Sequence, residues 1–221
     1  MFIGHFAVGL ASKRLAPRAG LGPLLAAPLL LDLLWPAFLL TGWERVRIEP
    51  GAAAFKTLVF EHYPWSHSLL LAGVWGALFA LVYRAKTGYR TGAIVIAAGV
   101  VSHWVLDWVT HGPDLPLWPG SSPLLGLGLW NSVAGTVVVE SLMLGAAVWL
   151  YAAGTRALDR TGRWAFWGFV TVLVLLYVAS VLSPPPPNVP ALAVGALSGL
   201  VFPFWAAWFD RHRESRPPSV A

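Results

Sequence analysis

The hydrophobic positions of the sequence form long apolar runs that short polar or charged segments separate. The first run, residues 1–16, is shorter than the roughly 20 residues that a helix needs to cross a bilayer. We expect the later runs to be spanning helices, and they cover residues 21–43, 69–83, 91–110, 124–151, 164–182 and 189–209. The pattern therefore predicts an all-α fold, a polytopic transmembrane helix bundle of about six spanning helices with a short N-terminal helix.

These runs predict a single structural domain. Residues 1–210 contain every apolar run, and we expect them to form one transmembrane helical domain. Residues 211–221 are rich in arginine and predict a disordered, basic cytoplasmic tail. Residues 44–61 carry charges of both signs and predict a loop, with a short surface helix over 52–60.

Composition supports a location in the membrane. Of the 221 residues, 57% are hydrophobic and only 11% are charged, whereas soluble domains carry about 25% charged residues. The sequence contains no cysteine, so a bound metal would be held by His, Asp, Glu or backbone oxygen. The net charge of +5 arises largely from Lys and Arg in the segments between the apolar runs, so we expect no nucleic acid partner.

The basic segments also predict the orientation. Lys and Arg cluster at residues 13–18, 84–90, 156–163 and 211–216, which alternate crossing places on one side of the membrane. The positive-inside rule assigns that side to the cytoplasm. We therefore expect a multi-pass protein of the cell membrane, with the bilayer as its main partner and its polar site on the non-cytoplasmic side.

The strongest candidate for chemistry is a polar stripe in the run 91–110. His103 and Asp107 are four residues apart, so they lie one above the other on one helix face, and His111 continues that stripe. An imidazole and a carboxylate at this spacing can bind one divalent cation. The alternative is a histidine that only hydrogen-bonds its neighbouring carboxylate and stabilises the helix.

Other ionisable residues lie in or beside apolar runs, where each costs several kcal/mol unless it is paired or metal-bound. The candidate metal ligands are His5, Asp32, His67, His103 and Asp107. The secondary candidates are His62 and His111. The candidate catalytic proton acceptors are Glu140 and Asp32, and Glu140 could instead bind the metal or orient a ligand imidazole.

Four motifs in the first half of the sequence resemble one known family. They are Gly4-His5, the acid Asp32, the segment His62-Tyr63-Pro64-Trp65-Ser66-His67-Ser68-Leu69-Leu70, and His103-x-x-x-Asp107-x-x-Thr110. In order and spacing they resemble the membrane-bound metal-dependent hydrolases, also described as LexA-binding, inner membrane-associated hydrolases. That family often has two acids at the second motif where this sequence has one, so no two-metal site is implied. The resemblance implies a divalent metal, held by the candidate ligands in some combination, and hydrolysis of an ester.

The sequence therefore leads to one hypothesis for function and two alternatives. The hypothesis is an integral membrane hydrolase in which a metal, with zinc expected, activates water to attack an ester or phosphoester of a lipid-like substrate. The first alternative is a transporter that uses the same buried residues to bind an ion or a solute. The second is a non-catalytic scaffold whose polar cluster only links the helices.

Overall fold

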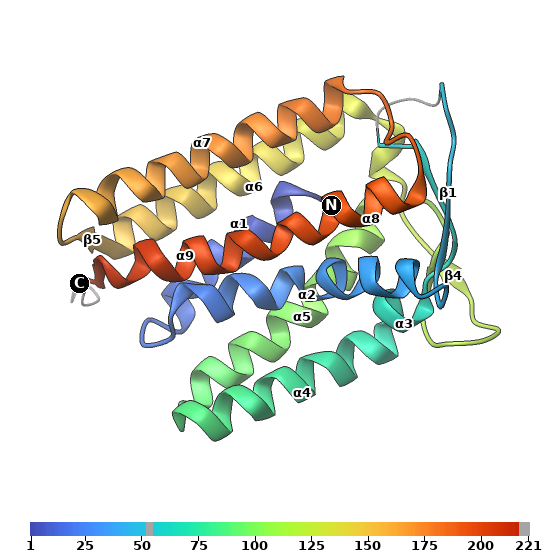
Figure 1. Cartoon of the computed structure of the whole chain (residues 1–221). Helices are drawn as coiled ribbons and strands as arrows, with labels where there is room; N and C mark the ends of the chain where they lie inside the picture. The colour runs from blue at the N-terminus through green and yellow to red at the C-terminus, as the bar shows by residue number, and fades with distance from the viewer. Residues whose placement is uncertain (52–54, 217–221) are drawn as a thin grey trace.

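The structure, a computed structural model, describes residues 1–51 and 55–216 and is a bundle of long, roughly aligned helices (Figure 1). Within these described residues, six helical segments are long and apolar enough to cross a membrane, which confirms the expected architecture. They are α2 (Leu21–Leu40), α4 (Leu69–Thr87), α5 (Arg90–Thr110), α6 (Val133–Gly154), α7 (Arg160–Leu182), and the continuous segment of α8 (Val189–Leu197), the 3-10 turn η2 (Ser198–Leu200) and α9 (Val201–Arg211).

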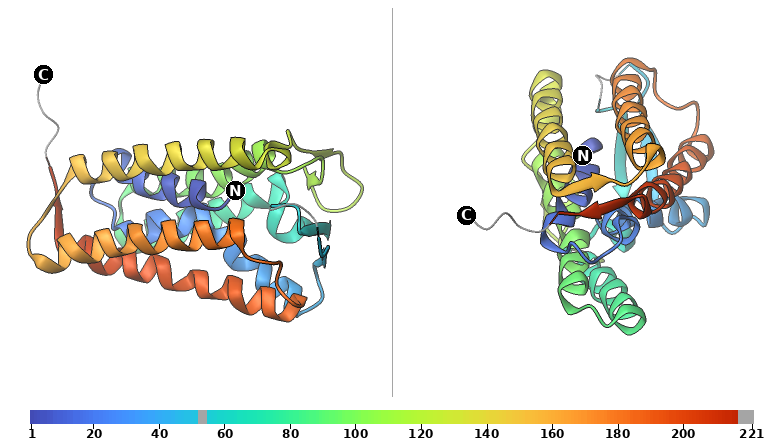
Figure 2. Two further views of the ribbon diagram at one scale, coloured as in Figure 1. Left: turned by 90° about the horizontal axis from the view of Figure 1, so that it is seen from above. Right: turned by 90° about the vertical axis from the view of Figure 1, so that its left-hand side faces the viewer.

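The short N-terminal helix α1 (Ile3–Leu15) lies inside the bundle (Figure 2). It packs against α2, α5, α6 and α7, and most of its residues are buried. The contact with α2 is close at Gly9, where a Cβ atom would lie 2.8 Å from the Cα of Leu25. Protein surrounds α1, which explains how an apolar segment too short to span the bilayer is accommodated.

The fifth apolar run starts its helix later than the sequence predicts. Residues 124–151 were expected to be helical throughout, but α6 begins at Val133, after the 3-10 turn η1 (Leu129–Asn131). Gly128 adopts a left-handed conformation with φ 74°, which breaks a helix. Ser132 then caps α6 by accepting a hydrogen bond from the backbone N–H of Gly135. The turn at Gly128 and the cap at Ser132 therefore set the start of α6, although the residues before it are mostly apolar.

Short antiparallel strand pairs close the two ends of the bundle. Near α3 (Pro64–His67), β1 (Arg45–Ile48) pairs with β2 (Leu58–His62), and β3 (Leu115–Pro116) pairs with β4 (Leu124–Leu125). At the opposite end β5 (Thr155–Ala157) pairs with β6 (Arg213–Ser215), so part of the expected tail 211–221 is paired. Residues 217–221 lie outside the described residues.

The surface helix expected over 52–60 is wrong for the described part of that range. Residues 52–54 lie outside the described residues, and Leu58, Val59 and Phe60 belong to β2. Val and Phe favour strands. The pairing of β2 with β1 also supplies interstrand hydrogen bonds, whereas an isolated short helix would be only marginally stable.

Candidate metal centre

Five ionisable side chains from four helices meet in one place inside the bundle. They form two overlapping groups of three, the ligating atoms within each group lie within 4.8 Å of one another, and His103 of α5 belongs to both groups. The first group is His5, His103 and Asp107, and the second is Asp32, His67 and His103. All five candidate metal ligands predicted from the sequence are therefore brought together, although they are up to 102 positions apart.

The nitrogen and oxygen atoms of this cluster converge. His103 Nε2 lies 3.0 Å from Asp107 Oδ2 and 3.2 Å from His67 Nε2. His67 Nε2 is also 3.5 Å from Asp32 Oδ1. His5 Nε2 lies 3.1 Å from Asp107 Oδ1, and the His5 and His103 rings stack at 3.8 Å between centroids. The imidazoles therefore all turn the Nε2 atom toward the carboxylates.

The orientation of His103 follows from a proline in α2. Its Nδ1 atom lies 2.7 Å from the carbonyl oxygen of Pro28, which can only accept a hydrogen bond. Nδ1 must therefore carry a proton, so Nε2 of the neutral ring presents a lone pair to the cluster. Gly99 allows this approach, because even a Cβ atom there would lie only 3.0 Å from the side chain of Ala27 in α2.

A buried carboxylate outside the cluster orients His67. Glu44 accepts hydrogen bonds from the backbone N–H of Ser66 at 2.7 Å and from its hydroxyl at 2.6 Å. The Ser66 oxygen then accepts from Nδ1 of His67, also at 2.6 Å. Burial raises the pKa of the Glu44 carboxyl above its usual value, while the Ser66 hydrogen bonds oppose that shift. We name this series Glu44–Ser66–His67 the serine relay.

These contacts leave two lone pairs facing each other. The Nε2 atoms of His67 and His103 are 3.2 Å apart, and both rings carry their proton on Nδ1. Two acceptors at that distance repel each other in a buried site unless a proton or a metal ion lies between or beside them. His103 is fully buried and Asp107 is 2% exposed, so water screens this repulsion little.

His111 lies at the edge of the cluster and His62 outside it. His111 Nε2 is 3.9 Å from Asp107 Oδ2. The other ring nitrogen of His111, Nδ1, is 3.0 Å from Asp114 Oδ1. Asp114 also accepts a hydrogen bond from the Tyr63 hydroxyl. Burial, followed by the neighbouring Asp114 charge, raises the pKa of Tyr63 well above its usual value, so Tyr63 remains a neutral donor. His62 ends β2 and belongs to neither ligand group.

Glu140 lies against the start of α1 and outside both ligand groups. Its Oε2 atom accepts hydrogen bonds from the backbone N–H groups of Phe2 and Gly4 at 2.9 and 3.0 Å. These donors lie at a helix N-terminus, where backbone N–H groups have no partner within the helix. The other oxygen, Oε1, is buried and has no hydrogen-bond partner among the described residues. The contacts therefore give Glu140 a capping role, and its role as a proton acceptor stays a prediction.

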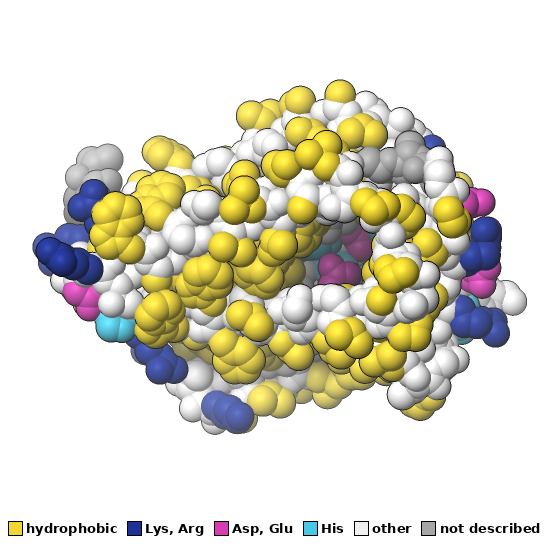
Figure 3. Space-filling model, turned by 45° about the horizontal axis from the view of Figure 1, so that its top comes forward, with side chains coloured by type: hydrophobic (Ala, Val, Ile, Leu, Met, Phe, Trp, Pro, Cys, Tyr) yellow, Lys and Arg dark blue, Asp and Glu magenta, His cyan; other side chains and the backbone are white. Residues whose placement is uncertain are grey.

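A cavity of about 250 Å³ gives access to the cluster. Asp32, His67, Asp107 and His111 contribute to its lining, and aromatic side chains such as Trp130 form much of the rest. Figure 3 shows a hollow on one face of the molecule with acidic and histidine side chains at its floor and hydrophobic side chains around it. The cluster is therefore reachable from outside the bundle.

Sequence reasoning missed the residues that support the ligands. Glu44 was interpreted only as one charge of a mixed loop, and Ser66 only as part of the motif that contains His67. The available signal was the serine directly before His67, since its hydroxyl can reach the neighbouring ring. No pattern in the sequence connects Glu44 to Ser66 across 22 positions.

Comparison with known proteins shows the family of this protein. The apolipoprotein N-acyltransferase of Parasynechococcus marenigrum (strain WH8102) is 29% identical over 135 residues, which are 58% of this protein. The match covers 27% of that relative, so this protein spans about a quarter of the relative's length. No solved structure matches the sequence. The family model of the YdjM inner membrane protein matches residues 1–185, a range that contains the whole ligand cluster. The protein belongs to the YdjM inner membrane protein family.

Proposed function

We propose that this membrane protein is a hydrolase that depends on a divalent metal, with zinc expected, and cleaves an ester or phosphoester of a lipid-like substrate. The observation that carries the proposal is the pair of Nε2 atoms, of His67 and His103, that face each other at 3.2 Å beside two carboxylates. A donor set of imidazole nitrogen and carboxylate oxygen, without sulfur, fits zinc and similar divalent ions.

Four buried residues would hold the ion: His5, His67, His103 and Asp107. When bound, such an ion lowers the pKa of a bound water and polarises the oxygen of an ester or phosphoester. The serine relay and the Pro28 carbonyl keep the Nε2 atoms of His67 and His103 directed at this point.

Asp32 is the residue that we propose as proton acceptor. Its side chain is 46% exposed, whereas the side chain of Asp107 is 3% exposed, and it lines the cavity that leads to the cluster. It lies 3.5 Å from His67 Nε2, so a proton taken up there remains beside the ligands. Glu140, with its unpartnered Oε1, is the second candidate.

A lipid-like substrate suits the location of the site. The cluster lies among spanning helices, and the family is one of inner membrane proteins. The relative named for apolipoprotein N-acylation supports lipid-linked chemistry in a membrane, although only part of it is matched. The basic segments 84–90 and 156–163 lie at the end of the bundle away from α3 (Figure 1). We therefore propose that the cluster faces the non-cytoplasmic side.

Hydrolysis by the purified protein in detergent micelles tests the proposal. We expect zinc-dependent release of p-nitrophenol from a p-nitrophenyl ester or phosphoester, and we expect His103→Ala to abolish it together with the bound metal. The control is His212→Ala, because His212 bonds Asp159 at the opposite end of the bundle. Metal content and rates equal in both variants would overturn the proposal. Zinc-dependent uptake into proteoliposomes without hydrolysis would favour a transporter.

A further inference from the structure

A second, larger cavity adjoins the metal cluster. It has a volume of about 470 Å³, which lies within the range of about 300–1,000 Å³ that is typical of ligand pockets. Its walls come from α1, α2, α7, α8, η2 and α9 and are mostly apolar. It shares four lining residues with the cavity over the cluster, which are Phe2, Asp32, Trp35 and Ser180. The two cavities therefore meet at Asp32.

We expect this cavity to open toward the hydrocarbon of the bilayer. It lies between the spanning helices α7 and α8, and apolar side chains such as Leu176 and Leu200 are exposed on these segments. The connection between the two helices contains four consecutive prolines, Pro184–Pro187, which favour an extended conformation of about 3.1 Å per residue. Such a connection keeps the helix ends apart.

Small side chains create the space. Gly195, Ala196, Ser198 and Gly199 line the wall formed by α8 and η2, and Ala179 lies opposite on α7. A Cβ atom added to Gly195 would meet nothing within 4 Å. The cavity is therefore open next to α8, and a larger side chain at this position would extend into it.

An unpartnered donor indicates where the polar end of a ligand would lie. Trp35 is 6% exposed and lines both cavities, and its indole Nε1 has no hydrogen-bond partner among the described residues. A buried N–H without an acceptor is unfavourable because it has lost its hydrogen bonds to water. An ester or phosphoryl oxygen at the junction, next to Asp32, would satisfy it.

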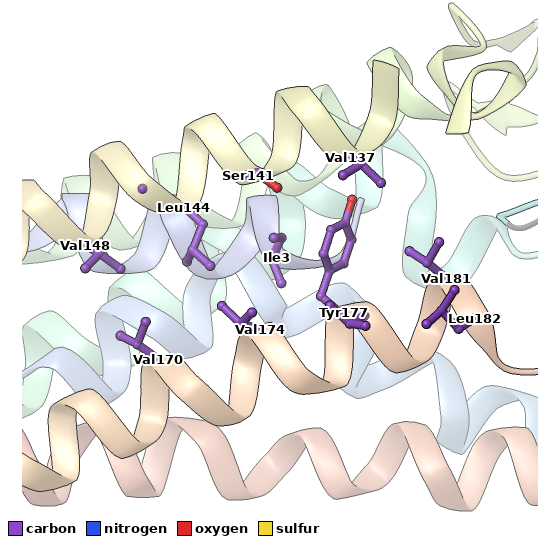
Figure 4. A pocket seen from close by; sticks show the side chains of 12 residues that line it. Ile3, Val137, Ser141, Leu144, Val148, Val170, Val174, Tyr177, Val181 and Leu182 are labelled. Carbon is purple, nitrogen blue, oxygen red and sulfur yellow. The ribbon is translucent and has the colours of Figure 1, made fainter. Parts of the chain in front are cut away.

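A comparable apolar groove of about 400 Å³ lies between α6 and α7 (Figure 4). Tyr177 and Ser141 are among its lining residues, but no His, Asp or Glu lines it among the described residues. It therefore offers an alkyl tail no route to the cluster, and it serves as the internal comparison for the test below.

We infer that the cavity between α7 and α8 binds the hydrocarbon tail of a lipid ester or phosphoester that enters sideways from the bilayer, while Trp35 donates a hydrogen bond to an oxygen of the head group. This inference rests on the proposed hydrolase function for its reaction. It adds the substrate class, an amphiphile with a long alkyl tail, and the route of entry. Binding of the tail can be measured without any reaction.

Photo-crosslinking tests the tail site directly. The probe is hexadecyl phosphate with a diazirine near the end of the tail, irradiated with the protein in micelles and mapped by mass spectrometry. We expect labels on α7, α8 and η2 at the cavity wall, and their loss with excess unlabelled hexadecyl phosphate. Labels spread evenly over the exposed helix faces, or confined to the groove between α6 and α7, would overturn the inference.

Two neighbouring substitutions sharpen the test. Gly195→Trp fills the cavity, whereas Val194→Trp places the same side chain at a position 63% exposed that does not line it. We expect Gly195→Trp to lower crosslinking by about tenfold and Val194→Trp to leave it unchanged. Ala196→Leu is the milder second variant if Gly195→Trp does not fold. Equal labelling in Val194→Trp and the folded cavity variants would contradict the tail site.

Hydrolysis assays separate a failure of this inference from a failure of the proposed function. We expect Gly195→Trp to lower kcat/KM for p-nitrophenyl palmitate by about tenfold or more, with p-nitrophenyl acetate hydrolysis and zinc content unchanged. Equal loss for both esters would contradict a tail site. Specific labelling of the cavity in a protein that hydrolyses no ester or phosphoester would overturn the hydrolase proposal and leave the tail site standing.

Discussion

Replacing Ser66 with alanine isolates the contribution of the serine relay to metal binding. The substitution removes the hydroxyl that holds the Nδ1 proton of His67 and that donates to Glu44. His67 then loses its fixed tautomer and its orientation. The backbone N–H of Ser66 still donates to Glu44 at 2.7 Å, so one of the two hydrogen bonds between Ser66 and Glu44 remains.

The size of the effect follows from these contacts. Residues that orient a metal-binding imidazole typically contribute about 10- to 100-fold in metal affinity. At about 1.4 kcal/mol per factor of ten, this is about 1.4–2.8 kcal/mol of binding free energy. The lost hydrogen bond to a charged carboxylate costs about 1.5–3 kcal/mol in the free energy of unfolding. We therefore expect a folded protein with weakened zinc binding.

The assay is a zinc titration against a competing chelator, with thermal unfolding measured on the same samples. The matched control is Ser68→Ala, because Ser68 is also buried but only caps α4 by accepting from the backbone N–H of Leu71. We expect Ser68→Ala to cost about 1 kcal/mol of stability and to leave zinc affinity unchanged. Equal zinc affinity in Ser66→Ala and Ser68→Ala would refute the reasoning.

The remaining predictions concern pH, substrate binding, helix packing and the metal. Burial raises the pKa of Glu44 in the folded state above 4.5, so its contribution to stability is largest below pH 4.5 and is lost as the pH rises through the raised pKa. Glu44→Gln should therefore reduce the decrease in unfolding temperature that occurs as the pH rises through this pKa. An unchanged slope of unfolding temperature against pH would contradict this assignment. Trp35→Phe keeps an apolar ring but removes the unpartnered N–H, so we expect kcat/KM to fall about tenfold with zinc content unchanged, as steady-state kinetics can check. Gly9→Val should destabilise the bundle by about 1–3 kcal/mol in denaturant unfolding, because its Cβ would lie 2.8 Å from the Cα of Leu25, and a neutral result would refute this contact. Chelation of the metal should lower the unfolding temperature, since free zinc at 100 times its Kd stabilises by about 2.7 kcal/mol, and no shift would indicate that no ion links the helices.

The sequence was sufficient to predict which ionisable residues form the cluster because the bilayer makes isolated charges costly. His103 and Asp107 share a helix face by their spacing alone, and Asp32 has no Lys or Arg near it in its apolar run. The same reasoning placed His5 and His67 near them, and the structure brings all five together. These predictions depend on local spacing and on burial, which a sequence reveals.

Other features depended on tertiary contacts that the sequence does not reveal. Glu44 is as polar as its exposed neighbour Arg45, yet it is 1% exposed because it bonds to Ser66 of another segment. Residues 58–62 pair as a strand with β1, although a helix was expected over 52–60. The cavity between α7 and α8 arises from the packing of six segments around small residues, and no motif marks it.

The central claim is that a cation joins His67 and His103 through their facing Nε2 atoms. The most direct measurement is anomalous diffraction at the zinc absorption edge from crystals grown with zinc. The account predicts one ion among the cluster residues, with both Nε2 atoms at about 2.0–2.1 Å from it. An anomalous map without a peak between these rings, from protein that binds no divalent ion in solution, would contradict the account.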